Sequence, residues 1–72
     1  MQENIKWEQV ANSAFISAFR YDPEAEELEI QFVKSVATYT SVPQEVADEF
    51  AAAESQGKYF HANIRNTFDY EN

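Results

Sequence analysis

The fold is decided by residues 41–57, which read SVPQEVADEFAAAESQG. Ser41 is predicted to be a helix N-cap because its hydroxyl can accept a hydrogen bond from an otherwise unpaired backbone N–H, and Gln44 three residues later completes a capping-box pattern. Gly57, the only glycine of the chain, is predicted to end the helix as a left-handed residue just beyond it. The pattern predicts one main helix that runs from Ser41 to Gln56.

This predicted helix has an apolar face and an acidic beginning. Pro43 fits the first turn, where its missing N–H costs nothing. Spacings of four, four and three place on one helical face the apolar residues Val42, Val46, Phe50 and Ala53. The helix dipole favours negative charge near the N-terminus, where the sequence has Glu45, Asp48 and Glu49. We expect the helix to pack on a sheet through its apolar face.

Upstream of the helix the sequence is typical of short β-strands. Aromatic and branched residues predict a strand after Ser13, and Leu28, Ile30 and Phe32 alternate with polar residues at a period of two. A turn is expected at residues 22–26, a tight connection at 34–35 and a third strand at 36–40. The expected core consists of Phe15 or Ile16, Phe19, Leu28, Ile30, Phe32, Val46, Phe50, Phe60 and Ile64.

These patterns predict an α+β fold. We expect an antiparallel meander of about three strands, the main helix on one face, and a second short helix near the C-terminus, where Phe60 and Ile64 stand four residues apart. A length of 72 residues fits one domain over residues 1–72, with residues 1–12 as an N-terminal extension. The chain has no cysteine, no signal-peptide pattern and no apolar run that could span a membrane, so we expect a soluble cytoplasmic protein.

The charge of the chain allows two interpretations. Thirteen acidic and five basic residues give a formal net charge of −8. Such a charge either keeps the protein soluble or forms an acidic face that docks on a basic protein surface, and it repels nucleic-acid phosphates. The candidate residues for a protein-binding acidic face are Glu24, Glu26, Glu27, Glu29, Glu45, Asp48 and Glu49.

One cluster of basic residues stands out on this acidic chain. Lys58, His61 and Arg65 follow one another at steps of three and four, which places them on one side of a helix. Their functional interpretation is a small anion or RNA site, with Tyr39 or Tyr59 available to stack on a base. The alternative is that the basic side chains pair with neighbouring acids.

The sequence lacks the motifs of common enzymes. A single glycine excludes the glycine-rich phosphate loops, and a single His argues against a histidine-based metal site. The acidic residues between Glu24 and Glu29 lack the ligand spacing and turn glycine of a calcium loop. We therefore expect a protein that is not an enzyme and has no metal or cofactor.

The second half of the chain resembles a known family. The residues that carry the likeness are Val42-Pro43-Gln44-Glu45-Val46, Ala53, Ser55, Gly57-Lys58-Tyr59-Phe60, Asn63-Ile64-Arg65, Phe68 and Tyr70. Upstream, the likeness continues through Ser13, Ile16, Tyr21-Asp22-Pro23, Leu28, Ile30 and Phe32. The sequence resembles the KTSC family, a small domain named after the C-terminus of some lysyl-tRNA synthetases that also occurs as stand-alone bacterial and phage-type proteins.

This resemblance implies a compact β-meander followed by a helix, and it implies no catalytic residue. The chain departs from the family pattern at Ala37, where a tyrosine is usual, and at Arg20, where a glycine is usual. RNA binding has been suggested for the family. We expect a non-enzymatic module that binds a basic protein surface, such as a phage or mobile-element inhibitor of a nucleic-acid-binding protein; the alternative is a weak RNA- or tRNA-binding accessory domain.

Overall fold

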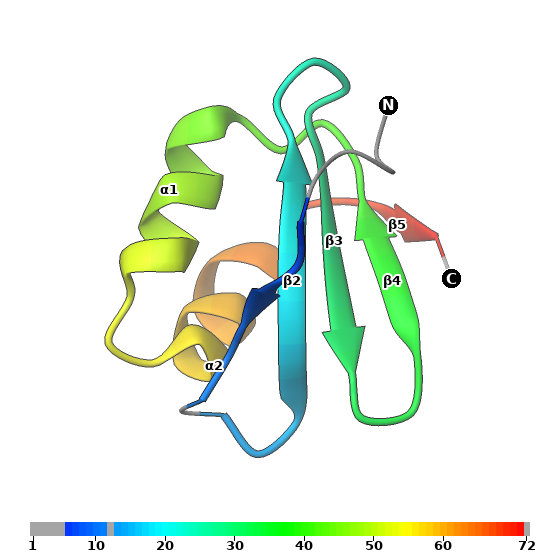
Figure 1. Cartoon of the computed structure of the whole chain (residues 1–72). Helices are drawn as coiled ribbons and strands as arrows, with labels where there is room; N and C mark the ends of the chain where they lie inside the picture. Colours follow the sequence, from blue (N-terminus) through cyan, green and yellow to red (C-terminus); the bar gives the residue numbers. More distant parts are fainter. Residues whose placement is uncertain (1–5, 12, 72) are drawn as a thin grey trace.

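The structure, a computed structural model, describes residues 6–11 and 13–71. These residues form one five-stranded antiparallel sheet whose strand order, β1-β2-β3-β4-β5, follows the chain, with the helices on one face (Figure 1). The strands are β1 (Glu8–Gln9), β2 (Ile16–Asp22), β3 (Glu27–Phe32), β4 (Val36–Tyr39) and β5 (Tyr70–Glu71). The helices are α1 (Gln44–Ala52), α2 (Gln56–Tyr59) and the π-helix η2 (Phe60–Ile64). The predicted α+β class is confirmed.

The two predicted turns form as short-range chemistry requires. Asp22 accepts hydrogen bonds through Oδ1 from the backbone N–H groups of Glu24 (3.0 Å) and Ala25 (3.3 Å), an arrangement that aspartate commonly provides at turns. The N–H of Phe32 donates to the carbonyl of Ser35 at 2.7 Å and closes the β3–β4 hairpin. The three central strands lie where the sequence predicted them.

The number of strands was underestimated, because the sheet has five strands in place of about three. The two additional strands are two residues long and lie at the edges, where β1 pairs with Ala18 and Phe19 and β5 pairs with Thr38 and Tyr39. Two residues are too few to show a period-two pattern. The segment predicted as an N-terminal extension therefore contributes β1 to the sheet; residues 1–5 and 12 lie outside the described residues.

The main helix is shorter than predicted at both ends. Ser41 is not its N-cap, because Ser41 has a φ of 57° and the helix begins after Pro43 without a side-chain cap. The N–H of Val42 instead donates to the carbonyl of Glu26 at 2.8 Å, which ties this stretch to the β2–β3 turn. The helix ends at Ala52, and Ala53 has an extended backbone with a ψ of 142°.

Gly57 does not end a helix, contrary to the sequence-based prediction. It lies inside α2, is buried and has no positive φ. A Cβ at this position would lie 3.0 Å from Cε1 of Phe15, so the glycine permits close packing between α2 and the start of β2. Ser55 is the N-cap of α2, since its Oγ accepts from the N–H of Lys58 at 3.3 Å.

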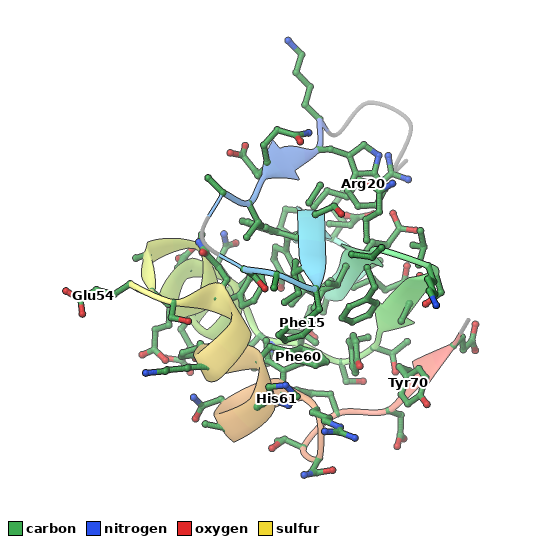
Figure 2. All side chains as sticks on the ribbon, turned by 90° about the horizontal axis from the view of Figure 1, so that it is seen from below. Phe15, Arg20, Glu54, Phe60, His61 and Tyr70 are labelled. Atoms are coloured by element: carbon green, nitrogen blue, oxygen red, sulfur yellow. The ribbon has the colours of Figure 1, made fainter. Side chains whose placement is uncertain are left out.

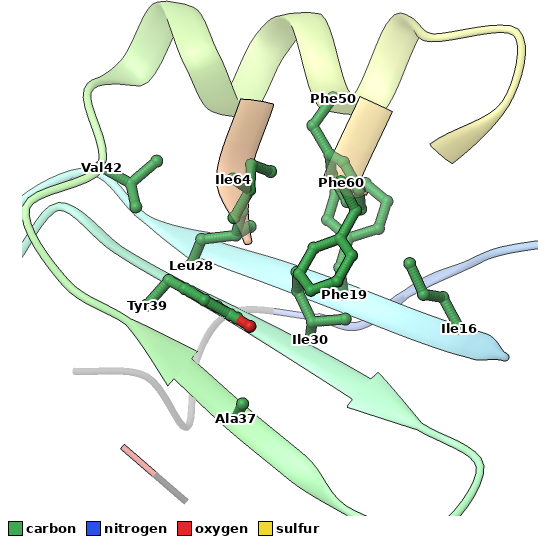
Figure 3. Close-up of a cluster of buried hydrophobic side chains, with 10 residues drawn as sticks. All are labelled: Ile16, Phe19, Leu28, Ile30, Ala37, Tyr39, Val42, Phe50, Phe60 and Ile64. Carbon is green, nitrogen blue, oxygen red and sulfur yellow. The ribbon is translucent and has the colours of Figure 1, made fainter. Parts of the chain in front are cut away.

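The core lies between the sheet and the helices (Figure 3). Seven predicted core residues are buried: Ile16, Phe19, Leu28, Ile30, Phe50, Phe60 and Ile64. The other predicted members, Phe15, Phe32 and Val46, are only partly buried and pack against this cluster. The sequence-based list lacked five of the buried apolar side chains that the structure describes: Ala18, Ala37, Tyr39, Val42 and Ala47.

Candidate functional site

A groove of about 550 Å³ opens between η2 and the β3–β4 hairpin. We call it the aromatic groove. It is lined by Phe15, Phe32, Ser35, Ala37, Tyr39, Phe60, His61, Arg65 and Tyr70. These residues come from the approach to β2, the β3–β4 hairpin, η2 with the residue after it, and β5. None of the described residues in this lining is acidic, although the chain carries a net charge of −8.

The walls of the groove are built from packed rings. The rings of Phe15 and Phe32 are nearly parallel, with an angle of 5° and centroids 6.3 Å apart. Phe60 packs edge-on against Phe32 (5.4 Å) and Tyr39 (5.6 Å), an arrangement that aromatic pairs favour. Tyr70 lies 5.2 Å from the ring of Tyr39 and is 55% exposed, so the groove ends in one accessible ring.

Two cationic or ionisable side chains line the groove beside these rings. Arg65 Nη1 lies 3.4 Å from Nδ1 of His61, and the His61 ring lies 5.1 Å from the ring of Phe15 and 5.5 Å from that of Phe60 (Figure 2). Both His61 and Arg65 are exposed. The groove can therefore offer the face of an aromatic ring and the permanent positive charge of Arg65 to the same ligand.

The π-helix determines which residues reach this groove. The N–H of Arg65 donates to the carbonyl of Phe60 at 2.9 Å, a bond between residues five apart. Such wide turns are rare and occur frequently at functional sites. The turn buries Phe60 and Ile64 against the sheet and leaves His61 and Arg65 on the groove side.

The structure brings together only some of the residues predicted for the basic site. His61, Arg65 and Tyr39 line the groove, whereas Lys58 and Tyr59 do not. Tyr39 is not an exposed stacking surface, because it is only 3% exposed; burial, followed by the proximity of Tyr70, raises the pKa of Tyr39, and Arg65 opposes this shift.

Tyr59 contacts α1 and does not line the groove. Its hydroxyl donates to Oε1 of Glu49 at 2.7 Å, and its ring lies 6.2 Å from that of Phe50. Burial and, next, the hydrogen bond to the Glu49 carboxylate raise the pKa of Tyr59 to about 12. Tyr59 therefore joins α2 to α1 and lies outside the lining of the aromatic groove.

Sequence reasoning missed four aromatic residues of the groove, Phe15, Phe32, Phe60 and Tyr70. Phe15 and Phe32 were assigned to the core, and they are indeed half-buried. Tyr70 was named only among the residues that carry the family resemblance, and no role in a site was assigned to it. The pairing of Tyr39 with Tyr70 in β4 and β5 is what places this exposed ring beside the groove.

The predicted acidic face is distributed over three places. Glu24 and Glu26 lie in the β2–β3 turn, and Glu27 and Glu29 belong to β3. Because side chains alternate along a strand, Glu27 and Glu29 point away from the face on which Leu28 and Ile30 meet the helices. The third group, Glu45, Asp48 and Glu49, lies exposed on α1, which covers the other face.

Glu29 is engaged within the sheet. It forms an ion pair with Arg20 on β2 and accepts a hydrogen bond from Oγ1 of Thr38 on β4 at 3.4 Å. The Arg20 guanidinium also lies 4.4 Å from the centre of the Trp7 ring, a cation–π contact. Arg20 thus connects Trp7, which directly precedes β1, to Glu29 of β3, and Glu29 is not an open docking residue.

The part of the chain that the structure describes, residues 6–11 and 13–71, contains neither a metal-binding cluster nor a membrane-spanning helix. Within these ranges no three His, Cys, Asp or Glu side chains are arranged so that they could hold a metal ion. No helix in the same ranges is long and apolar enough to cross a membrane.

Comparison with known proteins identifies the family. The sequence profile of the KTSC domain matches residues 12–68. The chain belongs to the KTSC domain family. A KTSC domain protein from Yersinia pestis has the same fold, with a TM-score of 0.87, 31% identity, and coverage of 93% of this chain and 94% of that protein. The resemblance noted in the sequence is confirmed.

Two related segments belong to much longer proteins. A lysine–tRNA ligase of a Nostoc species is 41% identical over 59 residues, and that of Trichormus variabilis is 39% identical over 59 residues. Each match covers 81% of this KTSC chain and 10% of the ligase. The chain thus spans about a tenth of the length of these relatives.

Proposed function

We propose that this KTSC domain is a non-enzymatic module that binds single-stranded RNA in the aromatic groove. The observation that carries the proposal is the composition of the groove, which combines the partly exposed rings of Phe15, Phe32 and Tyr70 with His61 and Arg65 and has no acidic residue among its described lining. Proteins that bind single strands combine positive charge for the backbone with rings on which bases stack.

The comparisons support an RNA ligand for this segment. Two proteins that contain a matching segment are named lysine–tRNA ligases, so their names place them with enzymes that use an RNA. The exposed ring of Tyr70 supplies a surface for a base, and each stacked base contributes about 1–3 kcal/mol in single-strand complexes.

The net charge limits the affinity. A chain with a net charge of −8 repels phosphates at long range, and Arg65 is the one basic residue, besides the ionisable His61, in the described lining. We therefore expect a dissociation constant on the order of 0.1–1 mM, which corresponds to about 4–5.5 kcal/mol. The salt dependence is expected to be shallow, because each phosphate contact on a single strand contributes only about 0.7 to the logarithmic slope.

The test compares two basic residues that differ in their position. The affinity of a labelled single-stranded oligoribonucleotide is measured by fluorescence anisotropy at low salt for the wild type, Arg65→Ala and Lys58→Ala. Both substitutions remove one positive charge at an exposed position, but only Arg65 lines the groove. We expect Arg65→Ala to weaken binding about tenfold or more, since a charged hydrogen bond contributes about 1.5–3 kcal/mol.

The control variant Lys58→Ala should change the affinity less than twofold. Equal losses in the two variants would mean that RNA responds to net charge alone and not to the groove. Absence of any anisotropy change for the wild type at millimolar protein would refute RNA binding.

A second candidate function is the docking of the acidic surface of α1 on a basic protein. Glu45 and Asp48 are exposed there, and the nine residues of α1 include no basic residue. This candidate takes its most concrete form as an inhibitor from a phage or mobile element that covers the nucleic-acid-binding surface of its partner. It requires salt-sensitive capture of a basic nucleic-acid-binding protein, and loss of that capture in the Glu45→Gln/Asp48→Asn variant. Capture that persists in high salt or in this variant would contradict it.

A further inference from the structure

A second hollow adjoins the aromatic groove. We call it the loop hollow. It has a volume of about 460 Å³ and is lined by residues 65–70. Its lining residues are Arg65, Asn66, Thr67, Phe68, Asp69 and Tyr70. Arg65 and Tyr70 line both hollows, so they form the wall that the two hollows share.

The loop hollow has a defined backbone. The N–H groups of Thr67 and Phe68 donate to the carbonyl of Ile64 at 3.1 and 3.2 Å. The carbonyl of Asp69 accepts from the N–H of Thr40 at 2.9 Å, which fixes the loop to the residue after β4. The loop is thus held at its beginning by the buried Ile64 and at its end by the sheet.

The two hollows differ in chemistry. The aromatic groove is walled by rings, whereas the loop hollow presents the exposed polar side chains of Asn66, Thr67 and Asp69. An amide offers both donors and acceptors to a base edge, and a carboxylate accepts from an exocyclic amino group. The carboxylate of Asp69 also disfavours a phosphate inside the loop hollow, so the place for a phosphate is at Arg65 in the shared wall.

We infer that the binding unit is a dinucleotide step of single-stranded RNA. One base lies in the aromatic groove, the phosphate that joins the two nucleosides contacts Arg65, and the second nucleoside occupies the loop hollow with its base edge at Asn66 and Asp69. Tyr70, exposed between the hollows, supplies the ring surface between the two bases. This inference rests on the proposed RNA binding and adds the length of its ligand.

Titration with ligands of increasing length tests the inference. The wild type is titrated with AMP, with the dinucleotide ApA and with the trinucleotide ApApA, and binding is followed through backbone amide shifts in NMR spectra. We expect ApA to bind about tenfold more tightly than AMP, a difference of about 1.4 kcal/mol. ApApA should bind within about threefold of ApA, because two hollows hold two nucleosides. The amide signals of Thr67 and Asp69 should respond to ApA and not to AMP.

The outcomes separate this inference from the proposed function. If AMP binds and ApA binds no more tightly, the loop hollow is not used, although the groove still takes a base. A further tenfold gain from ApA to ApApA would also overturn the two-nucleotide unit. If none of the three ligands binds, the proposed RNA binding fails together with the inference.

A pair of asparagine variants localises the second nucleoside. Asn66→Ala removes an exposed amide from the loop hollow, and Asn63→Ala removes an exposed amide from η2 that lines neither hollow. We expect Asn66→Ala to weaken ApA about threefold or more without changing the affinity for AMP, while Asn63→Ala changes neither. Equal effects of the two variants, or an equal loss of AMP and ApA in Asn66→Ala, would overturn the inference. Unchanged circular dichroism verifies that each variant is folded.

Discussion

Gly57→Ala is a sensitive test of how α2 packs against the sheet. Gly57 lies inside this helix, and a Cβ there would be 3.0 Å from Cε1 of Phe15 and 3.3 Å from Oγ of Ser13. The Ser13 hydroxyl has little freedom to move, because it accepts from the N–H groups of Phe15 and Ile16 at 3.3 and 3.2 Å. The ring of Phe15 is therefore the group that must shift.

Two opposing contributions determine how much Gly57→Ala changes the free energy of unfolding. Alanine in place of glycine inside a helix stabilises by up to about 1 kcal/mol. An added methyl group in a tight contact costs about 1–3 kcal/mol through displaced neighbours. We therefore expect the free energy of unfolding to fall by about 1 kcal/mol in Gly57→Ala. For a domain of this size, that lowers the melting temperature by about 4–8 °C.

A double-mutant cycle separates the two contributions. Urea and thermal melts are measured for the wild type, Gly57→Ala, Phe15→Ala and the double variant. Without the Phe15 ring, the alanine at position 57 should stabilise by up to about 1 kcal/mol, since the tightest contact is gone and only the helix preference and the 3.3 Å contact with Ser13 Oγ remain. The coupling between the two positions should be about 1–3 kcal/mol.

The cycle also tests the alternative that the sequence alone suggested. If Gly57 were a left-handed residue at the end of a helix, Gly57→Ala would destabilise the domain to the same extent with or without Phe15. Equal losses in the two backgrounds would refute the packing argument.

Three further predictions concern stability. Phe50 is fully buried and packs edge-on against Phe19 (4.8 Å), so Phe50→Ala should lose about 3–5 kcal/mol in urea melts, and a loss below about 1 kcal/mol would contradict this packing. Burial and Glu49 raise the pKa of Tyr59 from its ordinary value of 10.0 to about 12. The contribution of Tyr59 to the stability of the fold should therefore be fully present below pH 10 and should be lost as the pH rises through about 12. Phenolate absorbance should show this titration, and Glu49→Gln should lower the pKa; an unchanged curve would exclude the contact. Ser55→Ala should cost about 1 kcal/mol by removing the N-cap of α2, and an unchanged melting temperature would argue against the cap.

The parts of the fold that were predicted correctly depend on local chemistry. The alternation of Leu28 and Ile30 with polar residues locates β3, and Asp22 forms its turn with the N–H groups of the next few residues. The interior of α1, with Phe50 on its buried face, follows from helical spacing. In each case the determining contacts or spacings lie within a few residues.

The errors arose where a distant contact overrides a local preference. Ser41 has the chemistry of an N-cap. However, the hydrogen bond from the N–H of Val42 to the carbonyl of Glu26 ties this segment to the β2–β3 turn, and Ser41 has a positive φ and does not cap the helix. Gly57 has the chemistry of a helix end, but the ring of Phe15 on the approach to β2 requires the absence of a side chain there. Neither contact is visible in the spacing of neighbouring residues.

The candidate site was predicted in part for a related reason. His61 and Arg65 lie together in the groove, as their spacing on a helix indicated. Lys58 lies in α2, before the π-helix begins. The wider turn of the π-helix rotates the side chains that follow it about the helix axis, relative to their positions in a continuous α-helix. The regular step from Lys58 to Arg65 therefore does not keep them on one face, and only Arg65 reaches the rings.

The order of the strands has a consequence for folding kinetics. β2 and β3, and then β3 and β4, are joined by short turns, whereas the pairing of β4 with β5 must close a loop that contains every helix. Closing a longer loop costs more entropy, and contacts between near neighbours in sequence form faster. We therefore expect the three-stranded meander to form before β5 docks. The aromatic groove, which needs η2 and Tyr70, should then be completed after the meander.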